Sequence, residues 1–408
     1  MLLTSPAPPS SSSGQATRRE ELPGRFDLGL LLAALALASV GVIMVASSSI
    51  PIAEPIAKGV HLGPFYFLTR HLIFLSGGLI LAAIAMRTEL ARIEQRSFLL
   101  LLLAIGLLLL VFVPGLGMRI NGARRWINLG ISGFQSVEAV KLLLVIYLAS
   151  YLVRHREGVQ RQLFGVVKPV GVAGLIVVLL LAQPDFGSAT LLIATTVGMI
   201  WLGGARMRNL FLLGAPLLPA LAWAAMTQDY RVKRLTSFLD PWKDPFNDGF
   251  QLTQALIAIG RGEWLGVGLG GSIQKLYYLP EAHTDFILAV IAEELGLAGI
   301  VLVLALFAWL CGRGLVIGLR AAQRGLHFQA NVAFGISLCI ALQALVSVGV
   351  NLGVLPTKGL TLPLISSGGS SVMMTCAMVG MLLRVSYELA RAEARDVLTV
   401  QETQEAYA

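Results

Sequence analysis

Long apolar runs recur along the whole chain, and they decide what it can fold into. A helix needs about 20 apolar residues to cross the hydrocarbon core of a bilayer. Charged residues make up only 13% of the 408 residues, against about 25% in soluble domains, so the chain lacks the polar surface of a water-soluble protein. We therefore predict an all-α polytopic membrane protein with ten transmembrane helices. The predicted spans lie at about 28–49, 65–86, 98–114, 139–153, 166–182, 188–204, 209–226, 286–312, 328–353 and 363–386.

Polar segments flank these runs. The first run follows a Pro/Ser-rich stretch and is long enough to span, so it does not resemble a cleaved signal peptide. We expect residues 1–26 to form a disordered N-terminal tail and the polar end from Glu388 to be disordered, with a C-terminal tail at 389–408. The transmembrane domain then occupies 27–388, and its longest connection, 227–284, joins the seventh and eighth predicted spans.

Arginines in the short connections set the orientation. They precede the first predicted span and follow the second, fourth, sixth and eighth. Because basic residues gather in short cytoplasmic loops, we expect both termini in the cytoplasm. Arg119, Arg124 and Arg125 break this rule, since they fall in an outer connection. Cations on the outer face need an anionic partner, and a lipid-linked phosphate is one.

Several other classes of site find little support. Cys311, Cys339 and Cys376 lie inside apolar runs, away from any second cysteine or histidine pair, which is typical of small buried hydrophobic residues. The basic residues are scattered rather than striped, which argues against a nucleic-acid partner. No cluster has the spacing of a dedicated metal cage, so we predict no protein metal site.

The 227–284 connection is too long to be a simple loop. Its stretch Phe250 to Ile259 is apolar enough for a half-helix on or in the membrane surface. Six glycines then follow between Gly260 and Gly271. They lack a preceding strand and the Lys-Ser pair of a nucleotide-binding loop, so they indicate chain flexibility or close approach of the backbone to a ligand.

Asp285 follows this connection, at the start of the eighth predicted span. Pro280, Glu281 and Thr284 suit a helix start, and Asp285 would lie near the positive end of that helix. An N-terminal helix cap is therefore one interpretation of Asp285. The other is a general base at the outer membrane surface, which takes a proton from a sugar hydroxyl within hydrogen-bond reach.

Charged residues inside spans are costly and therefore indicate function. Lys141 opens the fourth span and Asp185 lies in the short outer turn before the sixth. Both are expected near one leaflet, and we predict that they form an ion pair; the alternative is that each reaches water separately. Glu293 and Glu294 lie deeper in the eighth span, where they either bond neighbouring helices or line a polar cavity.

The last outer turn carries Lys358 beside a Pro-broken helix start. Small residues then run from Ser366 to Ser371 inside the tenth predicted span. Such a run permits close helix packing. It also permits irregular backbone that offers N–H groups to an anion, and both interpretations stay open.

Several of these segments together resemble the SEDS family (shape, elongation, division and sporulation). The most specific matches are residues 230–262, the run YLPEAHTDFILAVIAEELG at 278–296, and residues 351–371; the NGARRWINLG run at 121–130 and QPDFG at 183–187 add to them. The resemblance covers about 27–388. The PTKGLTLPLIS run is more similar to the division branch of the family than to the elongation branch.

The resemblance implies a peptidoglycan glycosyltransferase that acts on lipid II at the outer face of the cytoplasmic membrane, at the division septum. It implies as partners a class B penicillin-binding protein (the FtsI transpeptidase) and other divisome membrane proteins. The family's essential aspartate corresponds to Asp285, and its membrane lysine and PDFG aspartate correspond to Lys141 and Asp185. The substrate-binding residues that we expect are Lys141, Asp185, Arg119, Arg124, Arg125, Arg231, Arg234, Glu281, His283, Lys358, Ser366, Gly368 and Gly369.

A mechanism follows from the chemistry of lipid II, a disaccharide-pentapeptide on undecaprenyl diphosphate. We expect Asp285 to deprotonate the acceptor 4-hydroxyl in a single inverting displacement that makes a β-1,4 linkage. We expect no tightly bound cofactor; a divalent cation (Mg²⁺ or Mn²⁺) bound with the diphosphate is an alternative way to balance its charge. A lipid II transporter and a scaffold for the transpeptidase are the competing functions.

Overall fold

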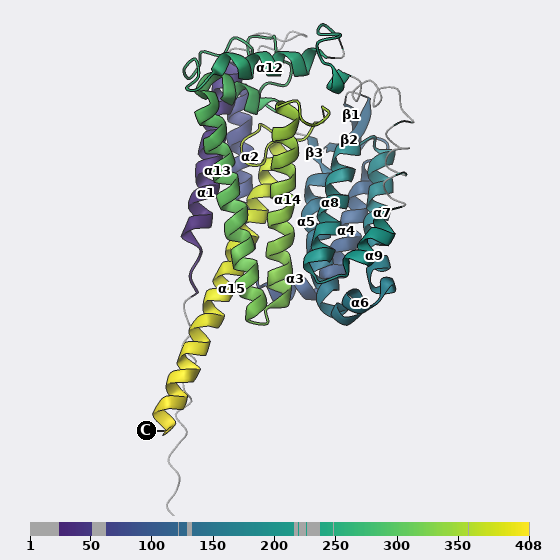
Figure 1. Cartoon of the computed structure of the whole chain (residues 1–408), viewed down its shortest axis with the longest axis vertical. Coiled ribbons are helices and arrows are strands. Elements are labelled where there is room, and N and C mark those ends of the chain that lie inside the picture. The colour runs from purple at the N-terminus through teal and green to yellow at the C-terminus, as the bar shows by residue number, and fades with distance from the viewer. Residues whose placement is uncertain are drawn as a thin grey trace, which may run out of the picture.

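The computed structural model describes residues 24–50, 63–120, 122–128, 133–215, 219, 226, 237–247, 249–357 and 359–407. This part of the chain is mostly helical, and its long helices lie side by side along the long axis of the molecule (Figure 1). The helices are α1 (Leu28–Ser49), α2 (Tyr66–Arg87), α3 (Leu90–Gln95), α4 (Ser97–Leu110), α5 (Ser136–Arg154), α6 (Arg156–Arg161), α7 (Leu163–Ala182), α8 (Phe186–Leu202), α9 (Met207–Gly214), α12 (Phe250–Gly262), α13 (Ile287–Gln323), α14 (His327–Asn351) and α15 (Gly369–Tyr407).

Seven of these helices are long and apolar enough to cross a membrane: α1, α2, α5, α7, α13, α14 and the Gly369–Leu398 part of α15. The shorter apolar helices α4 and α8 cover two further predicted spans. The predicted span at 209–226 begins within α9 and then lies mostly outside the described residues. A multi-helix membrane protein is therefore confirmed, whereas the count of ten spans stays a prediction. The half-helix expected from Phe250 is present as α12.

The helices form two groups that meet at α14. In one group, α15 packs along α2, and α13 packs between α1 and α14. In the other, α5 packs on α4, and α7 packs on α8. Because α14 contacts α5 and α8 as well as α13, it joins the groups through a continuous apolar core.

A small sheet corrects the prediction of an all-α fold. Strands β1 (Gly117–Ile120), β2 (Ala123–Asn128) and β3 (Gly133–Gln135) pair antiparallel in that order, at the end of the molecule that also carries α12 (Figure 1). This connection is too polar to span, so its backbone groups pair with one another instead. The strands are short and carry three arginines, which hides the alternating pattern that predicts a strand.

The C-terminal helix corrects a second prediction. The chain from Glu388 was expected to be disordered, but α15 continues to Tyr407 and projects beyond the bundle (Figure 1). Glu388 is tied down, because it accepts hydrogen bonds from Leu90 N and Gln329 Nε2 and pairs with Arg384 at 2.9 Å. The following residues are mostly Ala, Arg, Glu and Leu, which are strong helix formers. The predicted N-terminal tail lies almost wholly outside the described residues.

Helix α13 is broken at Gly296, where φ is +67° and ψ is −162°. The α12–α13 connection fills the break: Leu297 N donates to Glu263 O, and Val267 N donates to Glu293 O, both at 2.9 Å. Gly262 and Gly266 press against the backbone of residues 292–295, where a Cβ atom would collide. The glycines of this connection that pack here therefore serve close approach to the protein's own backbone rather than to a ligand.

Substituting Gly296 with alanine should destabilise the fold by more than about 2 kcal/mol. Alanine strains a left-handed φ, and its Cβ would lie 2.6 Å from Leu265 N. The matched control is Gly312→Ala in the same helix, where a Cβ meets open space; it should be neutral or stabilising by up to about 1 kcal/mol. Unfolding of both variants in one detergent measures this, and equal stability of the two would contradict the account of the break.

Candidate active site

Asp285 lies two residues before α13, where three segments meet. Its backbone carbonyl accepts a hydrogen bond from Asn351 Nδ2 at the end of α14, at 2.9 Å. A Cβ atom on Gly359 would lie 3.1 Å from Asp285 Oδ2, so the carboxylate lies against the turn that precedes α15. The side chain is partly exposed. The N-cap residue of α13 is Phe286, so Asp285 precedes the cap position.

Ser366 joins the Asp285 turn to the segment before α15. The Ser366 hydroxyl is buried, donates to Thr284 O at 2.7 Å and accepts from Leu362 N at 2.8 Å. Beside it, Ser367 N donates to His283 O at 2.9 Å. These bonds hold Asp285 in place through its own backbone neighbours.

The small-residue run packs closely, and its first half precedes the spanning helix, since α15 begins at Gly369. A Cβ on Gly368 would lie 2.8 Å from the Thr361 side chain, and one on Gly369 would lie 2.6 Å from the Phe74 ring. The N–H groups of Ser366, Ser367 and Gly368 donate to protein carbonyls. Close packing is therefore the better of the two interpretations of this run.

His283 and Glu281 flank Asp285 within the same turn. The His283 ring lies 4.5 Å from the Phe67 ring of α2, centroid to centroid. Burial lowers the pKa of His283 below its usual value, Glu281 opposes that shift, and Arg70 adds to it. Glu281 is exposed and accepts a hydrogen bond from Thr284 Oγ1 at 2.6 Å. The turn therefore carries carboxylates near an imidazole whose pKa is lowered by burial.

A series of hydrogen-bonded polar side chains connects this turn with the interior of the helix bundle. Lys141 Nζ lies 2.7 Å from Glu138 Oε2, one helical turn away on α5, and donates to Gln343 Oε1 of α14 at 2.6 Å. Gln343 Nε2 in turn donates to Thr361 O at 2.9 Å, and Thr361 Oγ1 donates to Ser371 Oγ at 2.9 Å. We call these five residues the Lys141 chain. It connects α5, α14, the turn beside Asp285 and α15.

The predicted Lys141–Asp185 ion pair is wrong. Lys141 pairs with Glu138, which lies within the same helix and needs no approach of a second element. Asp185 instead caps α8 by accepting hydrogen bonds from Ser188 N at 3.2 Å and Ser188 Oγ at 2.8 Å. It also lies 3.9 Å from Arg125 Nη1.

The outer arginines divide into two kinds. Arg125 of β2 bonds the carbonyls of Gln183 and Pro184 and so fixes the sheet to the α7–α8 turn. Arg119 and Arg124 face each other across the β1–β2 pair and are exposed, which leaves them accessible to an anion. The candidates Arg231, Arg234 and Lys358 lie outside the described residues.

Glu293 and Glu294 are fully buried and paired. Of the two interpretations that the sequence left open, bonding to neighbouring elements therefore holds, rather than lining a polar cavity. Glu293 pairs with Arg261 at 2.6 Å. Glu294 pairs with Lys275 at 2.7 Å and accepts from Ser47 at 2.7 Å. These pairs fasten the α12–α13 connection to α13 and α1.

Three residues of this site were missed from the sequence: Glu138, Gln343 and Asn351. Gln343 lies in the middle of an apolar span, and a polar residue there is a signal of function or of helix contact. Glu138 lies three residues before Lys141, the spacing of a local ion pair. Among the described residues, no group of three or more His, Cys, Asp and Glu side chains could hold a metal ion.

Comparison with known proteins identifies the family. The FtsW/RodA/SpoVE family model, described as cell cycle protein, matches residues 28–391. The chain belongs to the FtsW/RodA/SpoVE family. This confirms the resemblance to the SEDS proteins over nearly the whole chain.

Two similar relatives carry the name FtsW. A protein from Xanthomonas oryzae named "Probable peptidoglycan glycosyltransferase FtsW" is 58% identical over 381 residues, which cover 93% of this chain and 77% of that protein. One of the same name from Thioalkalivibrio sulfidiphilus is 50% identical and covers 92% of this chain and 94% of its own length.

Solved structures of this family share the fold. A chain of a peptidoglycan synthase complex, described as coordinating polymerization and crosslinking, has a TM-score of 0.71 at 30% identity and covers 89% of this chain and 98% of its own. The rod shape determining protein RodA of Thermus thermophilus has a TM-score of 0.64 at 29% identity, with 88% of this chain and 96% of its own covered.

Proposed function

We propose that the chain is a peptidoglycan glycosyltransferase that polymerises lipid II into β-1,4 glycan strands during septal wall synthesis. The proposal rests on the partly exposed Asp285 carboxylate, whose backbone turn is held by Asn351 and by Ser366 of the segment before α15. The names of the FtsW relatives support the same reaction class. A fixed, accessible carboxylate is what a hydroxyl nucleophile requires of a base.

In the proposed step, the acceptor 4-hydroxyl attacks the anomeric carbon of the donor. The new C–O bond forms as the bond from that carbon to the lipid diphosphate breaks, and the hydroxyl proton passes to Asp285. One in-line displacement converts the α donor into a β linkage. The pKa of a sugar hydroxyl lies far above 7, so the base contributes about 10²–10⁴-fold to the rate.

Cations on the outer face match the charge of the leaving diphosphate in this proposal. Arg119 and Arg124 are the exposed candidates among the described residues, and Arg231, Arg234 and Lys358 are candidates from the sequence. A Mg²⁺ or Mn²⁺ ion that takes part would arrive with the diphosphate, since such ions bind one or two carboxylates plus substrate phosphates.

The Lys141 chain and Ser366 act in this proposal as positioning groups. The chain reaches the turn beside Asp285 through the Thr361 carbonyl, and Ser366 reaches it through Thr284. Asp185 and Arg125 hold the sheet that presents the exposed arginines. Each keeps a reacting or charge-matching group at its place without contacting the sugar.

The proposal includes ten spans, cytoplasmic termini and an extracytoplasmic Asp285 in the inner membrane at the septum. Seven candidate spans and the basic short loops support this topology. It also includes a class B penicillin-binding protein as partner. Support for the partner comes from the similar chain, which was solved as part of a peptidoglycan synthase complex.

The competing function is transport of lipid II between leaflets. The test is reconstitution of the wild-type chain with its transpeptidase partner in liposomes that contain labelled lipid II. Glycan polymers formed from lipid II in the outer-facing leaflet support the transferase. Movement of label between leaflets without any polymer would replace it with the transporter.

A further inference from the structure

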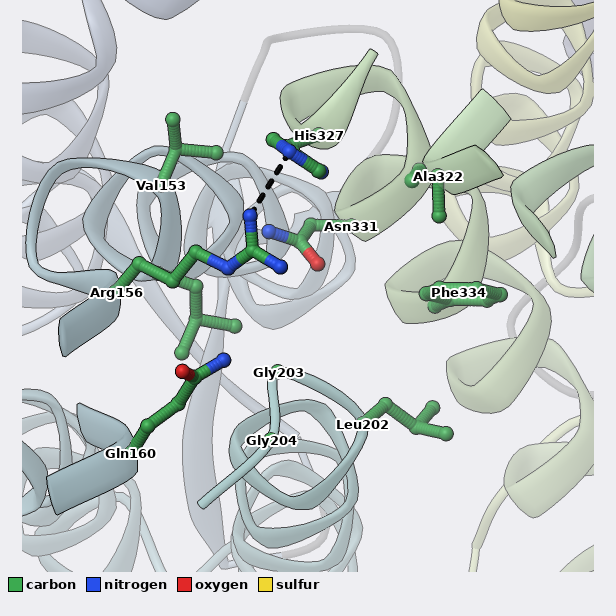
Figure 2. Close-up of a pocket in the computed structure, with 12 residues that line it drawn as sticks. Val153, Arg156, Gln160, Leu202, Gly203, Gly204, Ala322, His327, Asn331 and Phe334 are labelled. Carbon is green, nitrogen blue, oxygen red and sulfur yellow. Dashed lines mark hydrogen bonds between the residues drawn. The ribbon is translucent and has the colours of Figure 1, made fainter. Parts of the chain in front are cut away.

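A pocket with a polar lining lies at the opposite end of the bundle from Asp285. Helix α14 runs from His327 to Asn351, and Asn351 holds the Asp285 turn. At 1.5 Å per residue, the 24 steps between these residues put the two ends about 36 Å apart. Around His327 is a pocket of about 190 Å³ between the α13–α14 hairpin on one side and α5, α6 and the end of α8 on the other (Figure 2).

The polar side chains that line this pocket are one arginine, one histidine and two amides, and the arginine gives the lining positive charge. Arg156 and Gln160 come from α6, and His327 and Asn331 come from the first turns of α14. Figure 2 shows the Arg156 side chain reaching across the pocket, beneath His327 and beside Asn331. No Asp or Glu is among the described residues that line it.

Arg156 keeps most of its donors available. Its Nη1 lies 2.9 Å from His327 Nε2, and this is its only hydrogen bond to a described residue. Within the described ranges, it forms no ion pair. A guanidinium carries five N–H groups and accepts none, so His327 Nε2 is the acceptor and the proton of the neutral ring lies on Nδ1. Arg156 and His327 therefore both present N–H groups.

The shape of the pocket suits a tetrahedral oxyanion. Gly204, at φ +92°, forms part of its wall, and a Cβ there would lie 3.0 Å from Gln160 Nε2. The volume of the pocket is several times the volume that one molecule occupies in liquid water, about 30 Å³. The Asn331 amide nitrogen donates to Ala149 O at 3.4 Å, so Gln160 supplies the amide donor of the pocket. A planar guanidinium fork with an amide donor on another side matches the several oxygens of a phosphate better than a single point charge does.

We propose that this pocket binds the phosphate group of a ligand from the cytoplasmic side, either an anionic phospholipid headgroup or a free phosphate compound. Arg156 is the central contact, with Gln160, His327 and Asn331 around it. The site joins the two helix groups of the fold at the end remote from Asp285. The phosphate site rests on the proposed topology and not on the proposed reaction. Failure of the phosphate-site proposal would therefore leave the proposed glycosyltransferase reaction unaffected, and the reverse also holds.

The test measures thermal unfolding of the full chain under two sets of conditions. In detergent, inorganic phosphate is titrated against chloride at equal ionic strength. In nanodiscs, pure phosphatidylcholine is compared with phosphatidylcholine plus phosphatidylglycerol. Stabilisation by phosphate in detergent identifies a free phosphate ligand, and stabilisation by phosphatidylglycerol alone identifies a lipid headgroup.

The decisive variant is Arg156→Gln, and the matched control is Arg161→Gln, an exposed arginine of the same helix outside the pocket lining. The stabilising ligand should be required at about tenfold higher concentration or more for Arg156→Gln and unchanged for Arg161→Gln. If Arg156→Gln does not fold, Gln160→Leu is read instead and should weaken binding several-fold. No stabilisation of wild type by either ligand, or equal response of Arg156→Gln and Arg161→Gln, would overturn the site.

Discussion

Replacing Asp285 with asparagine will stop the polymerisation of lipid II, lowering the rate by about 10²–10⁴-fold or more. The amide keeps the size of the side chain but cannot take the hydroxyl proton. The substitution leaves the bonds from Asn351 and Ser366 in place, because they contact backbone carbonyls of the turn. The measurement is polymer length and rate from purified lipid II with the transpeptidase partner present.

The matched control for this variant is Asp244→Asn, the same change at an exposed residue in the 227–284 connection. It should polymerise at the wild-type rate. Capture of the partner should also be unchanged for Asp285→Asn, which separates a catalytic defect from loss of a scaffold. Polymerisation by Asp285→Asn at the rate of Asp244→Asn would remove Asp285 as the base.

Replacing Lys141 with methionine will destabilise the protein by about 3–5 kcal/mol. The change leaves the Glu138 carboxylate buried without its cation and removes the donor to Gln343 Oε1. Both side chains are almost fully buried, so solvent cannot replace the lost contacts. Denaturant unfolding in one detergent measures the loss.

Two further variants make this prediction specific. Lys168→Met changes an exposed lysine in the spanning helix α7 and should alter stability by no more than about 0.5 kcal/mol. The double variant Glu138→Gln with Lys141→Met removes both charges and should recover most of the lost stability. Equal stability of Lys141→Met and Lys168→Met, or no recovery in the double variant, would show that the pair does not carry the effect.

The helices were the most predictable part of the fold, because hydropathy and length alone define them. The first predicted span, 28–49, coincides with α1, and α14 differs from its prediction by two residues at most. The break at Gly296 was not predictable in this way, since apolar residues continue on both sides of it. The break depends on the α12–α13 connection, which lies about 30 residues earlier in the sequence. The backbone of that connection forms hydrogen bonds with the helix backbone on both sides of Gly296.

The candidate site was predictable as residues but not as partners. Lys141 and Asp185 were singled out because charges at membrane spans are costly, and Asp285 because a carboxylate at a helix start on the outer surface can act as a base. Their contacts depend on which elements approach: Lys141 found an acid on its own helix, and Asp185 became a helix cap. Gln343 connects Lys141 with Thr361 through its position in the fold, since it lies 202 residues from Lys141 and 18 from Thr361 in the sequence.

The most direct measurement of the central claim is an experimental structure of the Asp285→Asn variant with its transpeptidase partner and lipid II. We expect an acceptor 4-hydroxyl about 2.6–3.2 Å from the side chain at position 285, with the diphosphate of the donor toward the outer cations. A sugar bound elsewhere, with position 285 closed off from the substrate or facing the cytoplasm, would contradict it.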